Sequence, residues 1–421
     1  MTEQSPFTSG HRLPRNYAGE LLTIDHGSGV RLYDTAGTEY LDMGAGIAVN
    51  ALGYGRDDLA DIACEQMRKL IHISNLYTTE PTVLLARRLT EAQIGAWDPD
   101  FGAVHFGNSG AEANEAAMKY ARAYAQRSRG PGHHKLLSFH GAFHGRTMGS
   151  LSLTHSPKYR EPFEPLVPGC EYIPFNDVAA LEKTLDESFA GVIVEVVQGE
   201  GGLNRMTEEF AATLNRLCRK HGVILIADEV QTGLGRTGYL FGSEAVDLHP
   251  DIVSLSKPLA GGLPLSATII SNRINESLKL GDHGSTFGGG PVTTAVALRV
   301  WDIVADSAFL ADVRHSAAHL KQRLTELQRR FAFVGAPRGM GLLRGLPIHA
   351  ETERQGDVVA AVVAGARERG LLVLRSGANV IRIAPPLIIT EGEIDEGYEK
   401  LASTLEAVQA QFKDVLQRSS E

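Results

Sequence analysis

Lys257 follows a short apolar run, residues 252–255, and precedes a glycine-rich turn that contains Gly261 and Gly262. An ammonium group is costly to bury, so a lysine at the end of a buried strand either loses its proton more easily or finds a charged partner. A lysine with a lowered pKa is a nucleophile that can form a Schiff base. A lysine that merely ends a strand in solvent would fit this segment equally well, so other residues must decide.

Two other apolar runs also end in polar residues. Asp228 follows residues 223–227, and Ser109 and Gly110 stand between residues 103–106 and an alanine-rich helical stretch. Free backbone N–H groups at the start of a helix attract an anion such as phosphate, although a serine there is more often a plain helix cap. Asp228 by itself could equally be a paired or capping carboxylate.

The combination is more informative than its parts, because pyridoxal 5'-phosphate needs all three groups. A lysine holds its aldehyde, a carboxylate keeps its pyridine nitrogen protonated, and a helix start binds its phosphate. The sequence therefore predicts a pyridoxal-phosphate site that contains Lys257, Asp228 and the turn at Ser109 and Gly110. Cysteines with metal-ligand spacing do not occur, and no metal is expected.

The elements that must position these residues alternate between short apolar runs and amphipathic helical stretches. Strands that are apolar on both faces and separated by helices predict an α/β fold, with a mainly parallel central sheet and helices on both faces. Ligands bind beyond the carboxyl ends of such strands, where the three polar segments lie. The predicted strands are residues 103–106, 135–139, 191–197, 223–227, 252–255 and 267–270, and the predicted helices include 112–127 and 208–221.

The two ends of the chain look different from its middle. Short strand-like pieces occur at residues 21–24 and 30–33, and a long helical stretch at 290–330 leads into a region of mixed strands and helices. We therefore predict a large cofactor-binding domain, with both termini combining into a smaller α+β domain. The predicted parts are residues 1–65 and 311–421 for the small domain and 66–310 for the large domain.

Composition narrows the class of protein. The 421 residues are 43% hydrophobic and 22% charged, as in ordinary globular proteins, and the net charge of −9 favours neither nucleic acid nor an anionic membrane as a partner. Apolar stretches are too short for a membrane span, and residues 1–5 do not begin like a signal peptide. Cys64, Cys170 and Cys218 are scattered and odd in number, which suits a reducing compartment, so a cytoplasmic location is expected.

Five motifs in the middle of the chain carry a family resemblance. They are residues 108–115 (NSGAEANE), 140–147 (HGAFHGRT), 198–202 (QGEGG), 228–233 (DEVQTG) and 256–262 (SKPLAGG). In order and spacing they resemble class III aminotransferases, and the likeness runs from about residue 20 to the C-terminus. Residues 46–53 (GIAVNALG) and 72–77 (HISNLY) are similar to the acetylornithine aminotransferase branch. The resemblance implies fold type I of the pyridoxal-phosphate-dependent transferases.

The resemblance also implies roles for residues that match the motifs. Lys257 would carry the cofactor's aldehyde as a Schiff base and move protons, while Asp228 would pair with the pyridine nitrogen. Gln231 would hydrogen-bond near the phenolic oxygen of the ring. Phe143 would stack on one face of the ring, with Val230 on the other face.

A phosphate site is implied at two places. Ser109, Gly110 and Ala111 would bind phosphate through a hydroxyl group and backbone N–H groups. Thr286 would reach the phosphate that is bound to the neighbouring subunit. The active unit would then be a homodimer with shared active sites.

Two arginines are implied to hold substrate carboxylates. Arg146 and Arg382 carry the planar guanidinium group that binds carboxylates with two parallel hydrogen bonds, although Arg382 could also be an edge-strand arginine that extends to solvent. Glu200 would act as a gate. Paired with Arg382, it would mask the cation while an amine donor is bound, and then release it for the second carboxylate of glutamate or 2-oxoglutarate.

Gly46 bears on the choice of substrate. Ornithine aminotransferases carry a tyrosine at the matching position, so glycine leaves space for an N-acyl group and favours N-acetylornithine or N-succinylornithine over ornithine. Aminotransferases of 4-aminobutyrate, which can also have this glycine, stay possible. Two departures from the family pattern, Val196 after Glu195 and Gly290 before Pro291, place the chain off the centre of the acetylornithine branch.

The expected reaction is a ping-pong transamination in arginine biosynthesis. The terminal amine of N-acetylornithine would pass to 2-oxoglutarate, giving an aldehyde and glutamate. Two alternatives stay open. One is a racemase, mutase or decarboxylase on the same scaffold, and the other is a catalytically silent structural or regulatory homologue.

Overall fold

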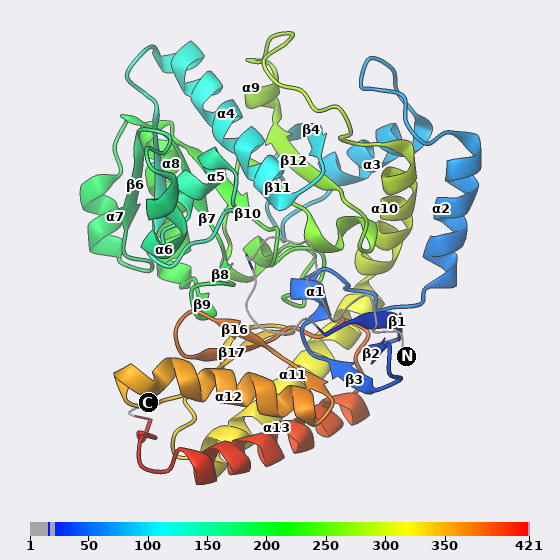
Figure 1. Ribbon diagram of the computed structural model, residues 1–421. Coiled ribbons are helices and arrows are strands. Elements are labelled where there is room, and N and C mark those ends of the chain that lie inside the picture. Colours follow the sequence, from blue (N-terminus) through cyan, green and yellow to red (C-terminus); the bar gives the residue numbers. More distant parts are fainter. Residues whose placement is uncertain (1–15, 17–21, 420–421) are drawn as a thin grey trace.

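The structure is a computed structural model of the chain and describes Asn16 and residues 22–419. Figure 1 shows a large sheet enclosed by helices in the upper part of the molecule. Below it, two small sheets lie beside the long helices α11 (Ser307–Arg330), α12 (Gln355–Glu368) and α13 (Glu391–Gln411).

The central sheet, as far as the chain is described, has seven strands in the order β4-β12-β11-β10-β7-β5-β6. Neighbouring strands from β11 to β6 run parallel, and β12 runs antiparallel to both β11 and β4. This arrangement confirms the predicted α/β fold with a mainly parallel sheet. The strands are β4 (Phe101–Gly107), β5 (Lys135–Phe139), β6 (Cys170–Ile173), β7 (Phe189–Val194), β10 (Ile224–Asp228), β11 (Ile252–Leu255) and β12 (Ser266–Ser271).

Alternation along β10 explains why both faces of the sheet are covered. Ile224 and Ile226 belong to an apolar cluster with the alanines of α4 (Gly110–Arg129), whereas Leu225 and Ala227 belong to a second cluster with α8 (Glu208–His221). Side chains of a strand point to alternate faces, so one helix layer covers each face. The two helices confirm the predicted stretches 112–127 and 208–221, α4 being longer than predicted at both ends.

Two strands differ from the prediction. β6 was not predicted, since it is the last strand of the sheet and most of its residues, including Glu171, are only half-buried. The predicted run 191–197 is broken after Val194, and Val197 begins the short strand β8 (Val197–Gln198), which pairs with β9 (Asn204–Arg205). The apolar residues on both sides of Glu195 hide this break, because both sides are buried.

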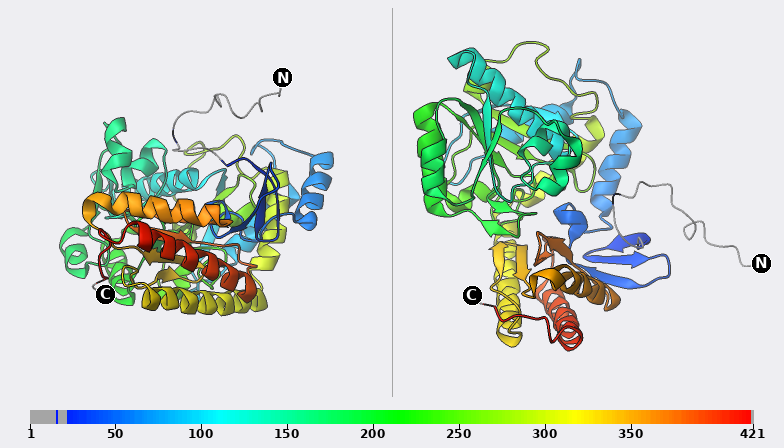
Figure 2. Two further views of the ribbon diagram at one scale, coloured as in Figure 1. Left: turned by 60° about the horizontal axis from the view of Figure 1, so that its bottom comes forward. Right: turned by 60° about the vertical axis from the view of Figure 1, so that its left-hand side comes forward.

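The two ends of the chain come together in the lower part of the molecule. β3 (Glu39–Asp42) pairs in parallel with β15 (Leu371–Leu372), and Leu41 packs in one apolar cluster with Val359 of α12 and Leu401 of α13. The right-hand view of Figure 2 shows these N-terminal strands beside the C-terminal helices. We propose, on this basis, that the division into residues 1–65, 66–310 and 311–421 reflects two domains.

Two predictions near the ends need correction. The strand predicted at 21–24 begins at Ile24 as β1 (Ile24–Ser28), and Leu21 lies outside the described residues. The stretch 290–330 is two helices, α10 (Pro291–Val304) and α11, because the Asp306 carboxylate caps the second helix. It accepts hydrogen bonds from the backbone N–H groups of Ala308 at 2.7 Å and Phe309 at 3.3 Å.

The other elements complete the two layers and the connections between them. They are β2 (Arg31–Asp34), β13 (Arg338–Met340), β14 (Leu343–Pro347), β16 (Leu374–Ser376), β17 (Val380–Ile383), α1 (Ala45–Ala48), α2 (Asp57–Lys69), α3 (Glu80–Thr90), α5 (Met148–Leu153), α6 (Pro157–Arg160), α7 (Val178–Thr184), α9 (Asn272–Asn275) and the 3₁₀ helices η1 (Glu161–Phe163), η2 (Gly242–Val246), η3 (Lys257–Ala260) and η4 (Thr352–Arg354).

Candidate active site

A cavity of about 250 Å³ lies at the carboxyl edge of the central sheet. It forms where β4, β10 and β11 end, because parallel strands deliver the residues that follow them to the same edge. Eight predicted site residues line it: Gly110, Ala111, Phe143, Arg146, Asp228, Val230, Gln231 and Lys257. Four further lining residues were not predicted: Asn114, His144, Gly145 and Glu195.

Lys257 stands in an unusual backbone conformation at this edge. Ser256 separates it from β11, and Lys257 itself has a φ of 31°, in the left-handed region that side chains larger than glycine's rarely adopt. Burial, and next the nearby Arg382, lower the pKa of Lys257 to about 8, although the Asp228 and Glu200 carboxylates act in the opposite direction. The lysine is therefore a better nucleophile than a lysine in water.

Asp228 is held by three hydrogen bonds and is almost fully buried. Its Oδ2 accepts from Asn114 Nδ2 at 2.8 Å and lies 2.7 Å from His144 Nδ1, and its Oδ1 accepts from the Val230 N–H at 3.1 Å. A carboxylate can only accept, so His144 donates to it from Nδ1. These bonds fix one carboxylate at the base of the cavity, where it can pair with a protonated ring nitrogen.

Glu195 is the least expected group in the cavity. It is buried, and its carboxylate accepts hydrogen bonds from the backbone N–H groups of Phe143 at 3.1 Å and Gly199 at 3.3 Å. Burial, and next the nearby Asp228, hold the pKa of Glu195 well above its usual range. The sequence carried a signal for it, since Glu195 is the only charged residue within the apolar run 191–197.

The start of α4 forms another wall of the cavity. Ser109 caps the helix by accepting a hydrogen bond from the Glu112 N–H at 3.3 Å, and Gly110 and Ala111 line the cavity. A Cβ atom on Gly110 would lie 2.6 Å from Cγ1 of Val230, so only glycine fits there. Backbone N–H groups at the start of a 20-residue helix favour an anion.

Arg382 and Glu200 form an ion pair beside the cavity. Arg382, on β17, is 3% exposed, and its guanidinium also donates to the Gly199 carbonyl at 3.1 Å and to Gln231 Oε1 at 3.3 Å. Its Nε has no hydrogen-bond partner among the described residues. Arg382 is therefore a buried cation whose charge is matched by Glu200, and it is not an arginine that extends to solvent.

Arg146 is held differently. Its guanidinium lies 3.7 Å from the centre of the Tyr159 ring and 5.5 Å from that of Phe143. Stacking on aromatic rings leaves the N–H groups at the edge of the guanidinium free to bind a carboxylate.

Five predicted residues do not line this cavity: Arg382 and Glu200, which lie beside it, and Ser109, Thr286 and Gly46. Ser109 and Thr286 are exposed, and Thr286 lies in the loop that precedes α10. Gly46 is exposed on α1 with a φ of 61°, and a Cβ atom there would lie 3.0 Å from Asn50 Nδ2. The left-handed backbone at Gly46 favours glycine on conformational grounds alone.

Comparisons with known proteins place the chain in a family. The family model described as "Aminotransferase class-III" matches residues 13–405. The chain belongs to the class III aminotransferases. It is 42% identical to a mitochondrial acetylornithine aminotransferase of Alnus glutinosa over 95% of this chain and 87% of that protein. It is 41% identical to the acetylornithine aminotransferase of Neisseria meningitidis serogroup B over 93% of this chain and 96% of that protein.

Solved structures agree with the fold of this class III aminotransferase. The ornithine aminotransferase of Toxoplasma gondii superimposes with a TM-score of 0.88 at 31% identity, over 96% of this chain and 94% of that one. The N-acetylornithine aminotransferase of Stenotrophomonas maltophilia gives 0.80 at 32% identity, over 95% and 98%. The predicted type I fold is thereby confirmed.

This class III aminotransferase is a pyridoxal-phosphate-dependent enzyme. Its cavity fits the cofactor chemically, because a nucleophilic lysine, a fixed carboxylate, an aromatic ring and a helix start surround the same space. Two buried atoms beside Asp228, Asn114 Oδ1 and His144 Nε2, have no hydrogen-bond partner among the described residues. Within the same residues there is no group of three or more histidines, cysteines and carboxylates that could hold a metal ion, and no helix is long and apolar enough to cross a membrane.

Proposed function

We propose that this aminotransferase moves the terminal amine of N-acetylornithine to 2-oxoglutarate, giving an aldehyde and glutamate by a ping-pong mechanism. The observation that carries the proposal is the ion pair between Glu200 and Arg382 beside the Lys257 cavity. Such an enzyme binds two substrates in turn at one place, the first with an uncharged end there and the second with a carboxylate. It therefore needs a cation that is paired while the first substrate is bound and free when the second one binds. A carboxylate on a neighbouring loop provides such a cover.

Lys257 and Asp228 carry the chemistry in this proposal. When bound, the cofactor supplies an electron sink for a carbanion at the substrate carbon. Lys257 would hold the aldehyde before the amine donor arrives, and its freed amine would then move a proton from the donor carbon. Asp228 holds the proton on the ring nitrogen, and Asn114 and His144 keep its carboxylate in place.

Other residues position the cofactor. Phe143 and Val230 would cover the two faces of its ring, and Gln231 would hydrogen-bond near the phenolic oxygen. Ser109, Gly110 and Ala111 would bind the phosphate at the start of α4. The support for these roles is that five of the six line the cavity, and that Ser109 caps the adjoining helix.

Arg146 and Arg382 bind substrate carboxylates. Arg146 holds a carboxylate of the amine donor, whose terminal amine then points to Lys257. In the second half-reaction Glu200 moves aside, and Arg382 takes a carboxylate of 2-oxoglutarate. The hydrogen bond from Arg382 to Gln231 connects this cation to the cofactor-binding residues.

N-Acetylornithine is the proposed donor because the curated relatives cited above bear that activity in their names and because glycine stands at position 46. N-Succinylornithine, ornithine and 4-aminobutyrate are the alternative donors. An acyl group contributes about 1–3 kcal/mol to discrimination in an apolar pocket, so activity with more than one of them is expected. Arginine biosynthesis in the cytoplasm is the setting we propose, and the three free cysteines agree with a reducing compartment.

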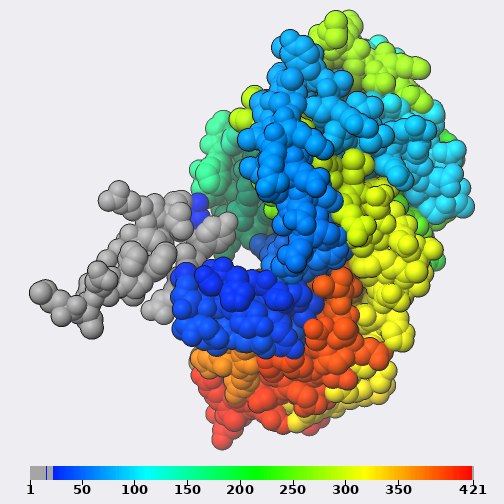
Figure 3. Space-filling model, turned by 90° about the vertical axis from the view of Figure 1, so that its right-hand side faces the viewer, coloured from blue at the N-terminus to red at the C-terminus, as the bar shows by residue number. Residues whose placement is uncertain are grey.

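The proposal includes a homodimer, in which Thr286 reaches the phosphate bound by the partner subunit. The loop of Thr286 packs on the segment between α2 and α3, where Asn75 Nδ2 donates to the Ser285 carbonyl at 2.9 Å and the His72 and Phe287 rings lie 5.3 Å apart. Figure 3 shows α2 and the segment after it as a ridge on one face of the molecule. Large exposed apolar side chains gather there: Met67, Ile71, Leu76, Tyr77, Val83, Leu84 and Phe287.

A panel of donors tests the proposal. Purified enzyme loaded with pyridoxal phosphate is mixed with 2-oxoglutarate and, in turn, N-acetylornithine, N-succinylornithine, ornithine and 4-aminobutyrate, and glutamate formation is followed. We expect the highest kcat/KM with N-acetylornithine. A higher value with ornithine or 4-aminobutyrate would replace the proposed donor, and conversion of the donor into an isomer or a decarboxylated amine without glutamate would indicate a racemase, mutase or decarboxylase. Cofactor binding without any reaction would indicate a silent homologue.

A further inference from the structure

A second cavity of about 560 Å³ lies next to the Lys257 cavity and shares Phe143 with it. Its walls include Lys158 and Tyr159 from α6, Glu200, and Arg375 from β16. Tyr159 is the ring on which Arg146 stacks, so this outer cavity begins where the donor's carboxylate is bound in the proposed function. The part of the donor beyond that carboxylate, which includes its acyl group, then faces the outer cavity.

The charges in the outer cavity do not balance. Glu200 contributes a carboxylate, but Arg382 already matches its charge. Lys158 is exposed and forms no ion pair or hydrogen bond within the described residues. Burial, and next the nearby His140, lower the pKa of His155, so this lining histidine adds no positive charge at neutral pH. The ammonium of Lys158 and the guanidinium of Arg375 are left without counter-charges.

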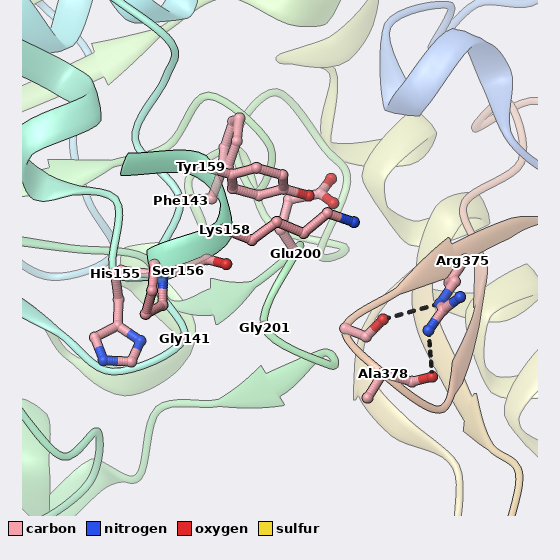
Figure 4. A pocket seen from close by; sticks show the side chains of 13 residues that line it. Gly141, Phe143, His155, Ser156, Lys158, Tyr159, Glu200, Gly201, Arg375 and Ala378 are labelled. Atoms are coloured by element: carbon pink, nitrogen blue, oxygen red, sulfur yellow. Dashed lines mark hydrogen bonds between the residues drawn. The ribbon is translucent and has the colours of Figure 1, made fainter. Parts of the chain in front are cut away.

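Arg375 is fixed in place across the cavity from Lys158 (Figure 4). Its Nε and one terminal nitrogen donate to the carbonyls of Gly377 at 3.1 Å and Ala378 at 2.8 Å, which leaves its other N–H groups free. The same loop is tied to the gate: the Gly377 N–H donates to the Glu200 carbonyl at 3.0 Å, and Ser376 Oγ donates to the Gly199 carbonyl at 2.7 Å. Hydrogen bonds therefore hold the loop that carries the Arg375 guanidinium.

We propose that Lys158 and Arg375 form an acyl-carboxylate subsite, which binds the free carboxylate of a dicarboxylic acyl group, such as succinyl, on the amine donor. The proposal rests on the proposed function, since it concerns the acyl end of the same donor. An acetyl group is uncharged and cannot use either cation. A succinyl group ends in a carboxylate, which two facing cations attract in a partly enclosed space. The enzyme then accepts acidic N-acyl donors in addition to N-acetylornithine.

The test compares two donors on the pyridoxal-phosphate-loaded enzyme. We measure kcat/KM for N-succinylornithine and N-acetylornithine, with 2-oxoglutarate as the acceptor, in the wild type and in Lys158→Met, Arg375→Gln and the double variant. Both substitutions remove charge. Methionine keeps most of the length of lysine, and glutamine, which ends where the arginine Nε stands, can still donate to the Gly377 carbonyl. Lys183→Ala, on the exposed side of α7, is the matched control for loss of one positive charge.

The measured quantity is the kcat/KM for N-succinylornithine divided by the kcat/KM for N-acetylornithine. We expect the double variant to lower this ratio by about tenfold and each single variant to lower it by less. The same ratio in the wild type should fall as salt is added, because salt screens exposed charges. An unchanged ratio in the double variant, or an equal fall in Lys183→Ala, would overturn the subsite while leaving the proposed function intact. Glutamate formation with neither acyl donor would overturn both.

Discussion

Lys257 and its neighbours show how single residues acquire chemistry from their surroundings. The lysine is nucleophilic because burial disfavours its charge. Its backbone is strained, and the Gly-rich turn after it also adopts positive φ, 60° at Gly261 and 109° at Gly262. Asp228 is held in place by residues from two other segments, Asn114 and His144.

Removing the Lys257 amine should abolish turnover. We expect Lys257→Ala to lower kcat for glutamate formation by more than about a thousandfold, since the nucleophile and the proton carrier are lost together. Glutamate assays and the visible absorbance of the bound cofactor measure the two effects. Lys220→Ala, at the end of α8, serves as the control for loss of a lysine elsewhere. Turnover near the wild-type rate in Lys257→Ala would exclude the assignment.

Capture of the cofactor should depend on pH through Lys257. Its lowered pKa, about 8, means that the ammonium form dominates below pH 8 and the nucleophilic neutral amine dominates above it. We expect the rate at which the cofactor-free protein binds pyridoxal phosphate covalently to rise with pH and level off above about pH 8. Rapid-mixing absorbance measures the rate, and Lys257→Ala provides the blank. A plateau reached only near pH 10 would show an ordinary lysine.

Glu200→Gln tests the gate. The neutral amide no longer matches the charge of Arg382, so the guanidinium is available for a carboxylate at all times. We expect KM for 2-oxoglutarate to fall several-fold and kcat/KM for the amine donor to fall about tenfold, measured as separate half-reactions. Glu182→Gln, which breaks an exposed ion pair with Arg216, should change neither value. Equal changes in both half-reactions would argue against gating.

At the scale of elements, the start of α4 has two uses. Ser109 caps the helix, and Gly110 and Ala111, which follow it, line the cavity. The same helix covers one face of the sheet with small alanine side chains, which let it lie close to β10 and β11. The position of the proposed phosphate site therefore follows from helix packing.

Ser109→Ala and Thr390→Ala separate these two uses, because Thr390 caps α13 in the same way, far from the cavity. Each loss of a cap costs about 1 kcal/mol, so both variants should have a slightly lower thermal midpoint without cofactor. Ser109→Ala alone should also bind pyridoxal phosphate more weakly, by about five- to tenfold in Kd by titration. Equal affinity in the two variants would leave Ser109 as a cap only.

At the scale of the molecule, the exposed apolar ridge formed by α2 and the segment after it predicts a dimer. We expect Leu76→Glu, at a side chain that is 87% exposed, to shift the protein towards monomer and to lower activity in parallel, because burying an unpaired carboxylate at an interface is costly. Sedimentation velocity over a range of concentrations measures the shift. Tyr239→Glu, outside the ridge, should leave the oligomeric state unchanged. A wild-type monomer with full activity would contradict the dimer.

Local pattern was enough to predict much of this protein. The apolar runs and the polar residues after them led to the sheet, to its active edge and to Lys257, Asp228 and Gly110, because strand period and strand direction are local properties that place chemistry at one edge. A prediction from local pattern missed the edge strand β6, because this strand is only half-buried and lacks an apolar pattern.

Only the tertiary structure decided the groups that act across long separations. Glu200 and Arg382 are 182 residues apart, and Asn114 reaches Asp228 across 114 residues. No local period encodes such pairs, because they arise when separate strands and loops close around one cavity. The lowered pKa of Lys257, the raised pKa of Glu195 and the unmatched charges of Lys158 and Arg375 all depend on that enclosure. The sequence thus determined which groups are present, and folding decided which of them share a low-dielectric space.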